Sequence, residues 1–317
     1  FALKKDSTTY PYSIFFAKRT LHCIHNTINL KKKRSKRHHY ISKFLIKEFT
    51  DEQGLLYIYD KIKDKFLTNK RSPKSIFFEN DRNTIVYDES KKTSLIEDDF
   101  FMELDNISAK IITIFQKEKN NKELLNVDNL ALLDFFIINL FWRLPLTDFA
   151  VKDLIQRAKI TSMGIKPDEI KNDLGWNKML RIGLYQETIE QMKNSPTKRK
   201  ENYARMTEFE KSLFVIGDYP FLFKNHLGKF TDLVEDDYLI AISSKRIISS
   251  SSNKLSNFNI NMFLNYNAAI IDQSKQYIAS NDLKVLKGSV EFYKKAKNEN
   301  FLYFSKKKLF IELSHTL

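Results

Sequence analysis

Two adjacent histidines, His38 and His39, follow a run of lysines and arginines at residues 31–37. An imidazole can act near pH 7 as a general acid or base or as a metal ligand. Neighbouring side chains point to opposite faces of a strand, so we expect one histidine to face a pocket and the other to be structural. The positive end of a following helix would lower the pKa of either ring. The alternative is that both histidines pack and bind the backbone.

Two further residues occur where predicted elements end. Asp218 follows a predicted buried strand in "LFVIGDYP", where a turn can project a carboxylate into a cleft. Its alternative role is that of an ordinary turn aspartate. Arg143 ends a strongly apolar helix and would suit a phosphate or a carboxylate, although a cation is also favoured there by the helix dipole.

Glu97 and Asp105 lie eight positions apart, close to one face of a predicted helix. They are tentative ligands for a divalent metal or partners for a histidine, and the alternative is a solvated acidic face. No other cofactor is indicated. Glycine-rich phosphate loops and a G-x-S-x-G nucleophile turn do not occur in the sequence, which argues against the reactions that use them.

The chain is strongly basic, with a net charge of +14 and a pI of about 9.4, which favours polyanionic partners. We expect the densest basic cluster to be an arm that binds nucleic acid, or else a solvated linker; it comprises Lys31, Lys32, Lys33, Arg34, Lys36 and Arg37. An AT-rich genome would produce a similar excess of lysine without selection for binding.

Cysteine and apolar content indicate where the protein works. Its single cysteine, Cys23, excludes an intrachain disulfide, and we expect no disulfide-linked partner. The apolar stretch 130–142 is too short to span a bilayer and is interrupted by polar residues. We therefore expect a cytoplasmic protein without membrane attachment.

The pattern of apolar residues predicts an α+β fold. We expect residues 1–35 to form a basic, poorly ordered leader, and 36–317 to form a single domain with a β-rich start (36–90), a helical part (95–211) and a mixed part (212–317). The helical middle should lie beside a mixed or antiparallel sheet made by the N-terminal hairpin and C-terminal strands. The expected helices are 41–49, 95–116, 127–144, 149–160, 168–173, 176–193, one ending near 211, 259–280 and 289–297; the expected strands are 55–60, 66–70, 213–220, one or two within 236–251, and 301–313.

Four segments together resemble a family of bacterial proteins called Domain of Unknown Function 4238. They are "RHHYISKFLIKEFTDEQGLLYIYD", "SLIEDDFFMELD", "FWRLPLTDF" and "FVIGDYP", and a polar helix with Asn265 and Asn267 follows. The chain has Ser42 where the family usually has proline, and Gly217 and Tyr219 where it usually has serine and asparagine. The resemblance implies an architecture but no reaction.

Three functions are compatible with these residues. The first is a nuclease-like enzyme acting on nucleic acid or another phosphate ester. It would use His38 or His39 as acid–base, Asp218 with Glu97 or Asp105 as carboxylates, and Arg143 on phosphate. The second is a non-enzymatic RNA- or DNA-binding module. The third is a structural or interaction protein whose polar cluster joins the two ends of the chain.

Overall fold

The computed structural model describes residues 36–88, 91–94, 96–117, 127–148, 151–152, 174–194, 204–224, 236–250 and 258–314. A β-rich segment comes first, helices follow, and strands alternate with helices towards the C-terminus, which confirms the α+β class. The predicted leader and the helix 168–173 lie outside the described residues, as does nearly all of the helix 149–160. Among the described helices, none combines the length and apolarity needed to cross a bilayer.

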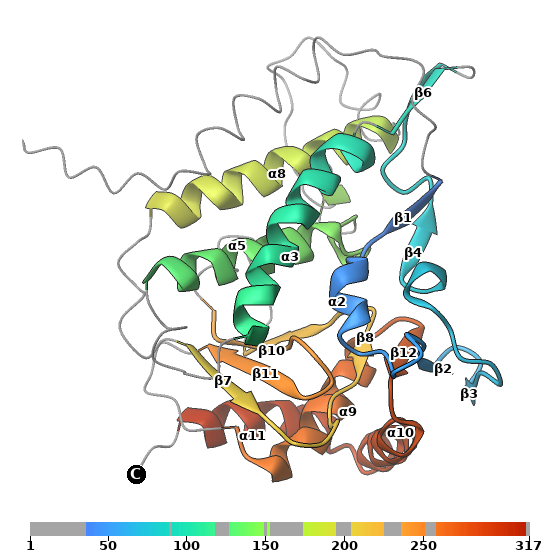
Figure 1. Cartoon of the computed structure of the whole chain (residues 1–317), viewed down its shortest axis with the longest axis vertical. Coiled ribbons are helices and arrows are strands. Elements are labelled where there is room, and N and C mark those ends of the chain that lie inside the picture. Colours follow the sequence, from blue (N-terminus) through green and yellow to red (C-terminus); the bar gives the residue numbers. More distant parts are fainter. Residues whose placement is uncertain are drawn as a thin grey trace, which may run out of the picture.

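The helical middle of the chain packs as one layer (Figure 1). It contains α3 (Met102–Lys117), which continues from the π-helical turn η2 (Ile96–Phe101), with α5 (Val127–Arg143) and α8 (Leu174–Asn194). The central helix, α5, is apolar on almost every side because it contacts α3 and α8 as well as the sheet beneath it. It ends at Arg143, two residues before Pro145, as predicted.

A four-stranded antiparallel sheet lies between this helical layer and the C-terminal helices (Figure 1). In spatial order its strands are β7 (Ala204–Glu208), β11 (Arg246–Ser250), β10 (Tyr238–Ala241) and β9 (Phe221–Phe223). Tyr238 donates a hydrogen bond from the sheet to Asp134 of α5 (3.4 Å). On the other side, the Ala241 N–H donates to the Tyr266 hydroxyl of α9 (Phe263–Gln273) (2.8 Å).

A second antiparallel sheet joins the two ends of the chain, as predicted. Its order is β3 (Lys65–Phe66), β2 (Tyr57–Asp60), β12 (Tyr277–Ser280) and β8 (Ile216–Gly217). Ile278 of β12 pairs with Tyr59 on one side and Gly217 on the other. Helix α10 (Leu283–Asn298) packs on β2 and β12 and is capped by Asp282, whose carboxylate accepts from the Lys284 N–H (2.7 Å).

Shorter elements lie at the edge of the helical layer. Strand β1 (Arg37–His39) pairs with β4 (Phe78–Asn80), and β5 (Ile85–Asp88) pairs with β6 (Lys91–Thr93). The helix predicted at 41–49 is the short α2 (Lys43–Lys47), and the 3-10 turn η1 (Pro73–Ser75) packs beside it.

Three predicted elements are wrong. Residues 301–313 form helix α11 (Leu302–Ser314), not a strand, and bury Leu309 and Phe310 while α11 packs on α9. The helix expected to end near 211 is replaced there by β7, because pairing with β11 stabilises an alternating segment with Ala204 and Met206 inside. The helix expected to reach residue 280 stops at Gln273, and β12 follows. In each case the tertiary partner overrides a weak local preference.

Candidate functional site

Arg143 lies at the C-terminal end of α5 and is 2% exposed. Its Nη2 donates to the His39 carbonyl (2.8 Å) and lies 3.9 Å from the Glu97 carboxylate. Its Nη1 donates to the Ser42 hydroxyl (3.1 Å) and to the Asp105 carboxylate. The structure thus brings together Arg143, Glu97, Asp105 and the backbone of His39, four positions that the sequence pattern selected.

Glu97 and Asp105 were predicted to bind a divalent ion. In the structure their positive partner is the Arg143 guanidinium. Ser42 reinforces the contact by donating to Asp105 (2.6 Å), and its hydroxyl makes no cap hydrogen bond to α2. Among the described residues, no group of three or more His, Cys, Asp or Glu side chains is arranged to hold a metal ion.

Both histidines lie in strand β1 and are buried. The Nδ1 atom of His38 accepts a hydrogen bond from the Asn83 N–H (2.8 Å). The Nε2 atom of His39 donates to the Pro73 carbonyl (3.1 Å), because a carbonyl oxygen can only accept. Burial, together with the positive charge of Lys43, lowers the pKa of His39 to about 4. We expected a lowered pKa, but the main cause is desolvation and not the helix dipole.

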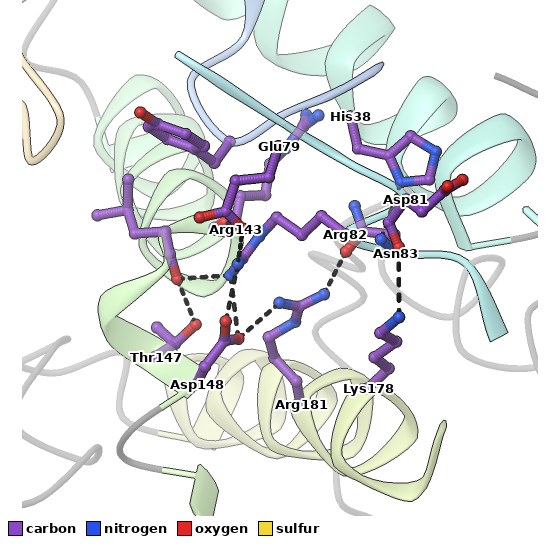
Figure 2. Close-up of polar contacts among 12 residues, drawn as sticks. His38, Glu79, Asp81, Arg82, Asn83, Arg143, Thr147, Asp148, Lys178 and Arg181 are labelled. Carbon is purple, nitrogen blue, oxygen red and sulfur yellow. Dashed lines mark hydrogen bonds and ion pairs between the residues drawn. The ribbon is translucent and has the colours of Figure 1, made fainter. Parts of the chain in front are cut away.

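Two further buried arginines, Arg82 and Arg181, escaped the sequence analysis. Arg82 Nε donates to the Arg143 carbonyl (3.1 Å) and its Nη2 donates to the Leu144 carbonyl (3.0 Å), so it caps the C-terminal end of α5. Figure 2 shows the Asp148 carboxylate between Arg82 (2.7 and 3.0 Å) and Arg181 (2.9 Å). We call Arg82, Arg143 and Arg181 the arginine cluster.

The arginine cluster connects four parts of the chain. Arg181 comes from α8 and also donates to the Asn83 side chain (Figure 2). Lys178, one turn earlier on α8, donates to the Asp81 (3.3 Å) and Thr84 (2.5 Å) carbonyls. Burial and the neighbouring Arg82 lower the pKa of Arg181 to about 10, which leaves it charged at pH 7. The cluster therefore holds α5, α8, the turn 81–84 and strand β4 in fixed positions.

Asp218 follows β8 and is 8% exposed. One carboxylate oxygen accepts from the Tyr40 hydroxyl (2.7 Å), and the other accepts from the backbone N–H groups of Gln276 and Tyr277. Burial raises the pKa of Asp218, although these hydrogen bonds act in the opposite direction. Asp218 and the two histidines therefore have different hydrogen-bond partners. The bond from Tyr40 to Asp218 connects the N-terminal segment to the C-terminal sheet.

A cavity of about 1110 Å³ opens where these elements meet. Its lining combines aromatic rings, lysines and a few carboxylates: Tyr40, Phe78, Glu79, Asp218, Tyr219, Phe223, Lys224, Asp272, Lys275, Tyr277, Lys306, Lys307 and Phe310, among others. Leu144 and Glu79 belong to its wall and also bind Arg82 (carboxylate–guanidinium distance 2.8 Å for Glu79). The arginine cluster therefore supports one wall of the cavity, and Asp218 with Tyr40 forms part of another.

The fold and this site define a basic α+β protein with a lysine- and aromatic-lined pocket beside a buried arginine cluster. The family model described as "Protein of unknown function (DUF4238)" matches residues 37–284, so the chain belongs to that family. The search of curated proteins and the search of solved structures found no significant match.

Proposed function

We propose that this protein binds a phosphate-bearing aromatic ligand, such as one nucleotide unit, in the pocket described above. The observation that supports this proposal is the combination of lysines and aromatic rings in one cavity. Ligand pockets typically measure about 300–1,000 Å³, so the cavity is large enough for a nucleotide. Lysines attract phosphate, and aromatic rings offer faces on which a base can stack.

The charges in the pocket favour an anion. Lys275 and Lys307 are exposed at its wall, and Lys306 is partly buried there. Of the carboxylates in the lining, Glu79 is paired with Arg82, and Asp218 is bound by Tyr40 and two backbone N–H groups. The third carboxylate, Asp272, is exposed, and Lys224 of the lining pairs with Asp237, so the excess of positive charge rests on Lys275, Lys306 and Lys307.

The arginine cluster supports this function indirectly. Arg143, which we expected to contact phosphate, contacts groups of its own chain, and Arg82 holds both Glu79 and the Leu144 carbonyl in the pocket wall. These contacts favour a positioning role for the arginines and leave phosphate binding to the lysines. The single cysteine is consistent with our proposal that the protein works in the reducing cytoplasm.

A nuclease-like activity in the same pocket is a second proposal, favoured by the pair formed by Asp218 and Tyr40. The raised pKa of the buried carboxylate brings it closer to neutrality, where a general base works best. His38 and His39 have less support as acid–base groups, because each has a ring nitrogen bound to the backbone. A divalent metal remains part of this proposal, to be tested by adding Mg²⁺ or Mn²⁺.

The binding test compares two charge-matched double variants by isothermal titration with AMP, inorganic phosphate and adenosine. Lys275→Ala/Lys307→Ala removes two pocket lysines, whereas Lys110→Ala/Lys245→Ala removes two exposed lysines elsewhere. We expect AMP to bind more tightly than phosphate or adenosine, and the pocket variant alone to lose about tenfold or more in affinity. Equal binding by both variants, or none by the wild type, would refute the proposal.

The activity test uses labelled RNA and DNA with and without Mg²⁺ or Mn²⁺, and compares the wild type with Asp218→Asn and His38→Ala/His39→Ala. Cleavage lost in Asp218→Asn at unchanged AMP affinity supports the nuclease proposal. Binding without cleavage under all these conditions leaves a non-enzymatic binding protein.

A further inference from the structure

A second basic surface lies on α10 and the β2–β3 hairpin, and its lysines belong to none of the motifs selected in the sequence. We call it the lysine face; its members are all exposed: Lys63, Lys65, Lys284, Lys287, Lys294, Lys295 and Lys297. Acidic side chains are fewer there: Asp60 lies 3.9 Å from Lys63, Glu291 is exposed on α10, and Asp64 pairs with Lys294. An exposed ion pair such as Asp64–Lys294 contributes little stability, so a phosphate can replace the carboxylate at low cost.

Aromatic rings beneath the lysines connect the helix to the hairpin. The ammonium of Lys287 lies 6.0 Å from the Phe66 ring centroid, and that of Lys294 lies 5.9 Å from the Tyr59 ring. Both rings belong to the hairpin, which lies beside α10 (Figure 1). These contacts therefore hold lysines of α10 close to the hairpin. The face is therefore one surface built from two elements and not a set of independent side chains.

The hairpin that carries part of the lysine face is bonded to the end of α9, which contributes to the pocket wall. Lys61, at the end of β2, donates to the carbonyls of Ile271 (2.8 Å), Asp272 (2.6 Å) and Ser274 (2.9 Å) at the end of α9. Asp272 and its neighbour Lys275 line the pocket. A chain with one unit in the pocket can therefore continue onto the lysine face.

From this continuity we infer that the ligand is a single-stranded nucleic acid, with one nucleotide in the pocket and its phosphate backbone along the lysine face. This inference rests on the proposed function and narrows it from a nucleotide to a polynucleotide. Helix α10 has 16 residues and is about 24 Å long, enough to contact several consecutive phosphates of a single strand. A membrane surface would use the lysines but leave the aromatic pocket without a role.

The test measures fluorescence anisotropy of labelled 12-nucleotide single-stranded RNA and DNA at several salt concentrations. The face variant is Lys63→Ala/Lys287→Ala/Lys295→Ala, and its matched control, Lys47→Ala/Lys110→Ala/Lys245→Ala, removes three exposed lysines from other elements. Circular dichroism verifies that both are folded. AMP titrations and vesicles containing phosphatidylserine complete the set.

We expect the face variant to bind the 12-mers about 10- to 100-fold more weakly at 0.1 M salt, with a log–log salt slope smaller by about 2. Its AMP affinity should stay unchanged, and the control should resemble the wild type. Equal affinity of the face variant and the control for the 12-mers would overturn the inference and leave the pocket proposal intact. Vesicle binding without 12-mer binding would also overturn it. Failure of the wild type to bind AMP would instead refute the proposed function.

Discussion

At the scale of single residues, side chains that resemble a catalytic set satisfy one another. Arg143 contacts Asp105, Ser42 and the His39 carbonyl, and its guanidinium lies over the Phe101 ring, 4.7 Å from the centroid. A buried guanidinium is stable only when carboxylates and carbonyls surround it. The cost of burying the Arg143 charge therefore explains why carboxylates and carbonyls surround it, and no substrate is needed to account for them.

Replacing Arg143 tests this interpretation. Arg143→Ala leaves Glu97 and Asp105 without their cation, so we expect the free energy of unfolding in urea to fall by about 3–5 kcal/mol. Arg143→Lys keeps the charge but cannot donate from two guanidinium nitrogens at once, so it should recover only part of the lost free energy of unfolding. Unchanged stability with lost AMP binding would instead make Arg143 a ligand contact.

His39 predicts a pH dependence of stability. Its pKa is about 4 in the folded chain and about 6.5 when unfolded, so between these values the unfolded chain binds the proton more strongly. Its contribution to the free energy of unfolding is therefore present above pH 6.5 and is lost as the pH falls towards 4, by up to about 1.4 kcal/mol per pH unit. Urea unfolding at several pH values should show a flatter dependence for His39→Gln. Identical pH dependences would contradict the assignment.

At the scale of elements, the close approach of β8 to α9 explains why residue 217 is a glycine. At Gly217, an added Cβ would collide with the Ser274 hydroxyl and meet Ile270 Cγ2 at 3.0 Å. Ser274 is the C-cap of α9 and donates back to the Ile270 carbonyl (2.7 Å). The glycine therefore lets strand and helix pack directly.

Gly217→Ala should lower the free energy of unfolding by about 1–3 kcal/mol because it overpacks this contact. Adding Ser274→Gly removes the colliding side chain and should recover part of the loss. Gly183→Ala serves as the control: Gly183 lies in α8, its added Cβ meets no atom within 4 Å, and a gain of up to about 1 kcal/mol is expected there. Thermal and urea unfolding measure all three variants. An unchanged free energy of unfolding in Gly217→Ala would show that β8 and α9 can move apart without loss of stability.

At the scale of the whole molecule, strands from the N-terminal and C-terminal parts of the described chain form one sheet. Strand β12 lies between β2 and β8, and Asp218 accepts from Tyr40, 178 positions earlier in the sequence. The pocket lies at this junction, because its wall includes Tyr40, Asp218, Tyr277 and α11 residues. A stable junction is therefore a condition for a formed pocket.

A double-mutant cycle with Tyr40→Phe and Asp218→Asn tests the junction. A hydrogen bond to a charged group contributes about 1.5–3 kcal/mol, so we expect a coupling energy of that size in urea unfolding at pH 8. Because the Tyr40 bond lowers the pKa of Asp218, Tyr40→Phe should raise that pKa further. Additive effects of the two substitutions would mean that the bond does not join the chain ends in solution.

The sequence by itself determined the elements with strong periodicity and the order in which they occur. Apolar spacing placed α5, and α3 together with its π-helical start, to within a few residues, and the alternation in 55–60 with the following turn predicted the β2–β3 hairpin. It also selected Arg143, Glu97 and Asp105, which do meet. These features are local, or follow from one face of an element being buried.

Only the tertiary structure decided which elements pack on each helix and sheet and which charges neutralise one another. The apolar patterns of 204–208 and 302–314 are mixed. Pairing with β11 made 204–208 a strand, and packing on α9 made 302–314 a helix. Arg82 and Arg181 carry no local signal, because their burial depends on Asp148, 66 and 33 positions away. The pocket likewise exists only once α11, β9 and β12 each supply part of its wall, since its lysines and rings come from segments far apart in the chain.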